Sequence, residues 1–236
     1  MSLYRRGVAT LLASWEAYAA GSAGAALHAP DGVSAAVFPA EPERGVYNNA
    51  LLFDGGAIEA MEEQYAAAGI GRFAAWVHES DAPLAAELER RGYMLDMTTR
   101  AMGMWLDDLR VPRPRLDLAA PAWRDYLRLF GLPGDLLSDD VGARFHLRIA
   151  RLKGASVAAS LAFDCDADCG VYNVATIHSA RRRGLGSAVT ALALHEARDR
   201  GCTTASLQAT PMAERLYAAL GFRDLGRYLE YVPGTA

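Results

Sequence analysis

The sequence predicts an α/β fold built from two similar domains in tandem. Runs rich in β-branched and aromatic residues alternate with stretches of helical periodicity along the whole chain. The order of these runs occurs twice, and a proline-stiffened segment, residues 111–115, separates the two copies. A chain of 236 residues is long enough for two small domains. We therefore expect one domain over residues 1–110 and a second over residues 111–236.

The repeat starts with the tetrapeptide Gly-Val-Tyr-Asn, which occurs at residues 45–48 and again at residues 170–173. Each copy opens a strand-like run. Three elements then follow in the same order: a helix that ends at glycine, a short strand, and a helix that begins near proline and ends in a glycine-aromatic pair. In the first copy they are marked by Gly69, residues 72–77, residues 83–91 and Gly92-Tyr93, and in the second by Gly201, residues 203–209, residues 211–220 and Gly221-Phe222. A matched order of five elements indicates a duplicated plan.

The two copies differ between the strand and the first helix. Leu52 to Gly69 spans 17 residues, whereas Ile177 to Gly201 spans 24. The extra length matches the segment at residues 179–185, which the first copy lacks. At this place the first copy offers Asp54, whose charge would repel a phosphate. We therefore expect residues 1–110 to be a domain without a cofactor site.

The extra segment of the second copy contains a glycine turn between a strand (171–177) and an amphipathic helix from Leu185 to the C-cap Gly201. The first N–H groups of a helix lack internal partners and form an anion site, and glycine lets the backbone approach a pyrophosphate. Arginine side chains and a hydroxyl can add hydrogen bonds. The candidate phosphate-binding residues are Arg181, Arg182, Arg183, Gly184, Leu185, Gly186 and Ser187.

Three other interpretations of the turn are weaker. The dinucleotide fingerprint Gly-x-Gly-x-x-Gly fails because Val189 stands at its third glycine. The turn also lacks the Gly-Lys-Ser/Thr of a Walker loop. A basic tract for nucleic acid would need more than three charges, and the net charge of −4 gives no reason to expect a polyanion partner.

Arg181-x-x-Gly184-x-Gly186 after a strand resembles the signature of the GNAT superfamily of N-acetyltransferases. Two downstream segments are also similar to the family: residues 207–210 resemble its next strand, and residues 213–222 resemble its closing helix with the Tyr-x-x-x-Gly-Phe ending. The resemblance covers residues 145–232 and is only architectural over residues 1–110. It implies a GNAT-type mixed, largely antiparallel sheet flanked by helices, with the first half degenerate.

The resemblance also implies the chemistry. Acetyl-CoA would be the co-substrate, and its pantetheine arm would lie where the strand splays from its neighbour, bonded to backbone groups of Ala175, Thr176 and Ile177. Thr210 replaces an asparagine common in the family. The acceptor would be a primary amine of a small molecule or a peptide, because attack on the thioester needs an uncharged amine.

Tyr217 is placed by the resemblance to protonate the leaving thiolate. We expect Leu216, Ala219 and Leu220 to face the sheet, with Tyr217 one residue off that face. The first copy has Leu88 at the matching position. The base stays open among His146, Asp164 and Glu230, and His195 is expected to be a packed or capping residue of a helix.

Several function classes are not expected. The sequence has no apolar run of membrane-spanning length, its N-terminus reads as an amphipathic helix, and Cys165-x3-Cys169 has no second pair to form a zinc site. Its basic residues are almost all arginine, as in a GC-rich bacterial genome. We expect a cytoplasmic enzyme without metal and leave a homodimer open. The alternatives are a non-catalytic acyl-CoA-binding regulatory module and an interaction scaffold.

Overall fold

The structure is a computed structural model that describes residues 1–43, 47–129, 131 and 145–234. The chain divides into two compact units. Unit 1 comprises Met1–Ser14 and Ala101–Leu225, and unit 2 comprises Trp15–Arg100 and Gly226–Ala236. The first two residues of the repeated tetrapeptide, Gly45 and Val46, lie outside the described residues.

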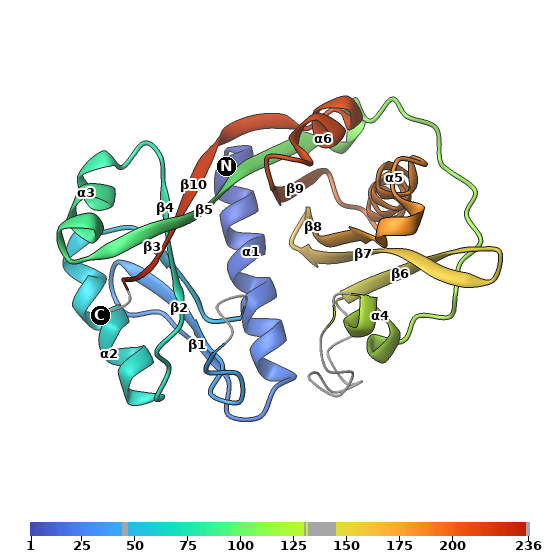
Figure 1. The fold of residues 1–236 in the computed structure, drawn as a ribbon. Helices are drawn as coiled ribbons and strands as arrows, with labels where there is room; N and C mark the ends of the chain where they lie inside the picture. Colours follow the sequence, from blue (N-terminus) through green and yellow to red (C-terminus); the bar gives the residue numbers. More distant parts are fainter. Residues whose placement is uncertain (44–46, 130, 132–144, 235–236) are drawn as a thin grey trace. The chain divides into compact units, whose positions relative to one another are not determined.

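Unit 1 has strand order β5-β9-β8-β7-β6, in which β7 pairs antiparallel with β6 and β8 while β8 pairs parallel with β9. Helix α5 packs on β6, β7 and β8 (Figure 1). Its elements are the start of α1 (Leu3–Ala20), the end of β5 (Tyr93–Trp105), η2 (Leu106–Asp108), α4 (Trp123–Leu129), β6 (Phe145–Leu152), β7 (Ala155–Cys165), β8 (Asp168–Thr176), η3 (His178–Ala180), α5 (Leu185–Asp199), β9 (Thr204–Ala209) and α6 (Glu214–Leu220).

Unit 2 has strand order β1-β2-β3-β4-β10. Antiparallel pairs join β1 to β2, β2 to β3 and β4 to β10, whereas β3 and β4 are parallel. Besides the end of α1 and the start of β5, it contains β1 (Ala26–His28), β2 (Val33–Val37), β3 (Asn49–Leu52), η1 (Gly55–Ala57), α2 (Ile58–Ala67), β4 (Ala74–His78), α3 (Ala82–Arg90) and most of β10 (Arg223–Pro233). Helix α2 packs on β2.

Both halves of the chain follow one plan of helix, three antiparallel strands, helix, parallel strand, helix and final strand. This order confirms the duplicated plan and extends it beyond the five elements expected. It also confirms a mixed, largely antiparallel sheet flanked by helices. The expected helix from Leu185 is α5, and the expected strand at residues 203–209 is β9.

The units do not coincide with the expected ranges 1–110 and 111–236. The final strands are exchanged between the halves: β4 pairs with β10, with Leu229 opposite Val77, and β9 has β5 as its neighbour. The proline-rich segment after residue 110 lies inside unit 1, because Leu106 and Leu109 before it are buried in that unit's core together with Ala205. A linker composition therefore did not mark the boundary between the units.

The start of α1 is tied to the middle of the unit 1 sheet. Asp168 at the beginning of β8 is 3% exposed and accepts hydrogen bonds from the hydroxyls of Thr10, Thr204 and Ser206 at 2.6–2.8 Å. A buried carboxylate is tolerated when its oxygens are hydrogen-bonded, as they are here. N-terminal residues thus help to build the unit that contains the glycine turn at residues 181–187.

No helix in the described part of the chain is long and apolar enough to cross a membrane. Over the same residues, no group of three or more His, Cys, Asp and Glu side chains is placed to hold a metal ion.

Candidate active site

The glycine turn joins β8 to α5 through a short 3₁₀ turn. Arg182 and Gly184 have positive φ values of 64° and 74°, and Gly184 is the N-cap of α5, which begins at Leu185. None of the side chains that the structure describes caps this helix start. The first N–H groups of α5 therefore keep their capacity to bind an anion, and the positive helix dipole adds to it.

The two glycines of the turn serve different purposes. A side chain on Gly184 would meet nothing within 4 Å, so glycine is favoured there by the left-handed backbone. A Cβ on Gly186 would lie 3.5 Å from Leu216 Cδ1, 3.8 Å from Thr176 Oγ1 and 4.0 Å from Val174 Cγ1. Gly186 therefore keeps space open between the end of β8 and α6.

Strands β8 and β9 separate after the first three residues of β8. Their parallel pairing runs from Asp168–Thr204 to Gly170–Ser206, although β8 continues to Thr176 and β9 to Ala209. The backbone groups beyond Gly170 on this side therefore have no strand partner in β9. The splay that the resemblance implied is present, and it leads toward the phosphate turn.

Which backbone groups face the gap follows from the pairing on the other side of β8. Ile177 donates its N–H to Val157 O at 2.9 Å, so this donor, expected among the cofactor contacts, points toward β7. Strand residues alternate in the side to which their N–H and C=O point. Thr176 and Val174 therefore turn their backbone groups toward the gap, while Ala175 turns its groups toward β7.

A bulge interrupts β8 just before this stretch. The register with β7 shifts between Ala159 and Leu161, and Asn173 takes φ 49°. Its Nδ2 donates to Tyr126 Oη on α4 at 2.8 Å. Sequence reasoning missed Tyr126. The usable signal was Asn173, because asparagine tolerates the left-handed conformation of a bulge better than most residues.

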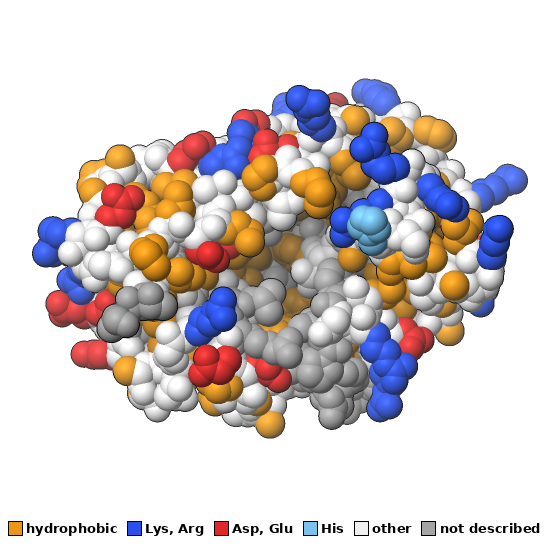
Figure 2. All heavy atoms as spheres, in the orientation of Figure 1, with side chains coloured by type: hydrophobic (Ala, Val, Ile, Leu, Met, Phe, Trp, Pro, Cys, Tyr) orange, Lys and Arg blue, Asp and Glu red, His pale blue; other side chains and the backbone are white. Residues whose placement is uncertain are grey.

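The remaining turn residues surround the α5 start. Arg181 Nε donates to Thr176 O at 3.2 Å, whereas Arg182 and Arg183 are exposed, and Leu185 and Ser187 are half-buried. Figure 2 shows basic side chains gathered on the face of unit 1 that carries α5 and α6. The exposed Thr210 follows β9. Its backbone carbonyl accepts hydrogen bonds from the N–H groups of Ala213 and Glu214 at the start of α6.

Tyr217 is itself on the buried face of α6, whereas the sequence predicted that it would lie one residue away from that face. It is 7% exposed, its ring meets Phe222 edge-on at 5.9 Å, and burial raises its pKa to about 12. Ala219, expected to face the sheet, is exposed. The buried stripe is Tyr217 and Leu220, because a tyrosine ring buries far more apolar area than an alanine methyl. The hydroxyl therefore stays protonated at neutral pH.

The sequence profile of the Acetyltransferase (GNAT) family matches residues 104–222. The chain belongs to this family. That range covers half of the chain and contains the splay, the turn, α5 and Tyr217. GNAT proteins are acetyltransferases that draw the acetyl group from acetyl-CoA, and the uncapped, glycine-opened helix start fits the phosphates of that co-substrate.

Solved GNAT structures resemble the whole chain. A GCN5-related N-acetyltransferase from Kribbella flavida has 21% identity and a TM-score of 0.75, with 100% of this chain and 97% of that chain covered. A tandem GNAT protein from the clavulanic acid biosynthesis pathway has 14% identity and a TM-score of 0.58, with 98% and 96% covered. At these identities the likeness shows the fold. No curated protein sequence matches the chain.

Two of the residues considered as the base lie at the wrong end of the GNAT sheet. Asp164 pairs with Cys169 near the β7–β8 hairpin, whereas the turn follows Thr176 at the other end of β8. Asp164 accepts two hydrogen bonds from Arg200 and contacts His146 at 3.2 Å. Burial and the Arg200 charge hold the pKa of His146 below its usual value, and Arg200 keeps that of Asp164 low despite burial.

His195 and Glu230 have other surroundings. His195 Nε2 lies 2.9 Å from Val111 O, so this histidine fastens α5 to the segment after residue 110, as a packed residue does. Glu230 belongs to unit 2, where burial raises its pKa to about 7.

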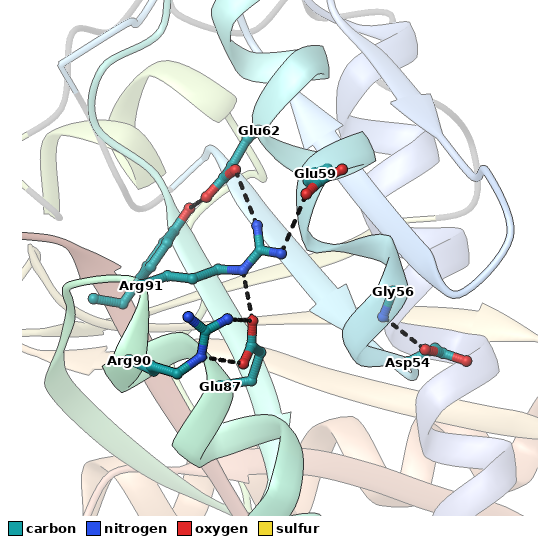
Figure 3. Close-up of polar contacts among 8 residues, drawn as sticks. Asp54, Gly56, Glu59, Glu62, Glu87, Arg90 and Arg91 are labelled. Carbon is teal, nitrogen blue, oxygen red and sulfur yellow. Dashed lines mark hydrogen bonds and ion pairs between the residues drawn. The ribbon is translucent and has the colours of Figure 1, made fainter.

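Unit 2 differs from unit 1 both at the turn before the helix and in the parallel strand pair. Figure 3 shows the Asp54 carboxylate turned to Gly56, whose N–H it accepts at 2.7 Å. The parallel pairing of β3 and β4 runs to Leu51–Trp76, one residue before β3 ends. The 3₁₀ turn capped by a carboxylate and the strand pair without a splay therefore differ from the corresponding features of unit 1.

Proposed function

We propose that the protein is an acetyl-CoA-dependent N-acetyltransferase whose turn at residues 181–187 binds the cofactor pyrophosphate. The gap beyond Gly170 and Ser206 would take the pantetheine arm. The observation that carries this proposal is the continuity of the two features: the unpaired side of β8 leads directly to an uncapped helix start. Each feature alone is common, but together they provide a gap for the arm and an anion site for the phosphates.

The chain's own groups would act as follows. The first N–H groups of α5 and the exposed arginines would hold the phosphates, and Thr176 and Val174 would bond the amide groups of the arm. A backbone N–H on the unpaired edge of β8 would stabilise charge on the carbonyl oxygen. Tyr217, neutral at working pH, would donate a proton to the leaving sulfur.

The proposed acceptor is a primary amine, either of a small molecule or of a peptide. A free alkylamine has a pKa near ~10.4, so it must lose a proton before it attacks. Neither His146 nor Asp164 is placed for this step, because both lie at the hairpin end of β7 and β8.

An amine panel tests the proposal by release of free CoA thiol from acetyl-CoA. Small amines, amino acids, aminoglycosides and peptides with free N-termini form the panel, and product mass confirms acetylation. Gly186→Val serves as the inactive control. Stoichiometric CoA binding without transfer to any amine would contradict the enzyme proposal and favour a regulatory acyl-CoA-binding module.

A further inference from the structure

Unit 2 contains a buried carboxylate that the GNAT reaction does not account for. Glu230 lies on β10 opposite Trp76 of β4, and only 8% of it is exposed. Thr99 Oγ1 donates to its Oε1 at 2.8 Å. All three residues belong to unit 2. The site therefore does not depend on the phosphate turn.

Within the described part of the chain, one oxygen of this carboxylate has no hydrogen-bond donor. Among the described residues no donor bonds Oε2, and this atom is not among the fully enclosed, unsatisfied ones. Burying a carboxylate is costly unless its oxygens are bonded. Burial and the nearby charge of Asp96 raise the pKa of Glu230 to about 7, which is the signature of an anion that lacks a compensating donor.

The surroundings of Glu230 suit a positive ligand with an apolar body. Trp76 meets Tyr228 at 5.6 Å and Trp15 at 5.7 Å between ring centroids, and Trp76 Nε1 donates to Asn49 Oδ1, which fixes the indole. Aromatic faces attract cations. Along β5, exposed apolar side chains flank Asp96 in sequence: Met94, Leu95 and Met97.

We propose that unit 2 binds a primary ammonium group at Glu230, with Oε2 accepting the ammonium N–H and the Trp76 indole beside the cation. The ligand class is a small aromatic or alkyl amine. This site goes beyond the proposed acetyl transfer, and its binding does not depend on acetyl-CoA.

The charges around the site set the pH range of binding. Asp96 on β5 adds negative charge, and His78 on β4 lies next to Tyr228, with ring centroids 6.0 Å apart. The ammonium form of an alkylamine persists to about pH 10. Glu230 must be ionised to bind it, so affinity should rise from pH 6 to pH 8.

Calorimetric titration of the full chain without CoA tests the proposal. The probes are benzylamine and hexylamine, and benzyl alcohol is the uncharged counterpart. We expect saturable amine binding at pH 8 that is at least tenfold tighter than alcohol binding. Glu230→Gln should weaken amine binding at least tenfold and remove the pH dependence, while Thr99→Val should weaken it less.

Glu63→Gln is the matched control, because Glu63 is an exposed carboxyl of unit 2 on α2. It should bind amines as the unaltered protein does. Equal affinities for benzylamine and benzyl alcohol, no saturable amine binding, or unchanged binding by a folded Glu230→Gln protein would each overturn the site. Because CoA is absent, none of these outcomes bears on the acetyl-transfer proposal.

Discussion

The β8–α5 junction of unit 1 and the β3–α2 junction of unit 2 have the same place in the repeated plan but opposite properties. In unit 1 the parallel pairing stops six residues before β8 ends, and Gly184 leaves the helix start free. In unit 2 the strands stay paired, and Asp54 bonds the Gly56 N–H. The proposed cofactor site of unit 1 therefore combines two features, and unit 2 differs from it in both.

The largest expected effect comes from separating the halves. Residues 111–236 alone lack the end of β5 and the start of α1, both of which belong to unit 1. We expect this fragment to show no cooperative unfolding transition and no CoA binding by calorimetry. A folded fragment that binds CoA like the full chain would show that the second half is an independent domain.

The next effect concerns the space at Gly186. Gly186→Val should weaken CoA binding by 100-fold or more, since a branched side chain would fill the region beside Leu216 and Thr176. The matched change in unit 2 is Gly55→Val, whose Cβ would meet only Leu84 at 3.8 Å. It should leave CoA affinity unchanged. Calorimetry with circular dichroism as the folding check distinguishes the two.

Tyr217→Phe should lower kcat by roughly 100-fold with little change in CoA affinity, the scale of general acid assistance. The ring remains to pack against Phe222, so the fold should survive. Steady-state kinetics on an acceptor found in the amine panel measures the effect, provided that chemistry limits turnover. A kcat within about twofold of the original would exclude Tyr217 as the acid.

The two buried carboxyls of the units offer a smaller contrast. Asp168 accepts three hydroxyl hydrogen bonds, whereas Glu230 accepts one. The folded-state pKa of Glu230 is raised from 4.5 to about 7, so its protonated form favours the fold. Below pH 4.5 the fold has the full stability contribution of protonated Glu230. As the pH rises to 7, this contribution falls by up to about 3 kcal/mol.

Glu230→Gln should remove this pH-dependent loss. Chemical unfolding at pH 5 and pH 8 measures it: the variant's free energy of unfolding should change less between the two pH values than that of the unaltered protein. An identical change in both proteins would show that Glu230 ionises normally in the fold.

For the last comparison we expect no change in the number of CoA molecules bound per chain. One CoA should bind per chain, and Asp54→Gly should not create a second site, because β3 and β4 remain paired in the variant. Two equivalents in calorimetry would contradict the requirement for both features.

The sequence allowed the local parts of this site to be predicted, and the reason is that they depend on nearby residues. Glycine at a strand-to-helix junction specifies a helix start, and Leu185 begins α5 as expected. The exchange of β5 and β10 was missed, because strand partners far apart in sequence leave no local pattern. The burial of Tyr217 was also not predicted. Two overlapping apolar stripes on α6 could each face inward, and the core against which α6 packs decides between them.

The exchanged strands bear on how the chain folds as it is synthesised. Val77 pairs with Leu229, so the sheet of unit 2 is completed only when nearly the entire chain is available. Pairings over such long separations slow folding and raise contact order. Until β10 has been synthesised and has paired with β4, β4 presents an unpaired edge, the kind of surface that promotes aggregation. A ribosome-bound chain that stops before residue 226 should therefore rely on chaperones more than its length alone suggests.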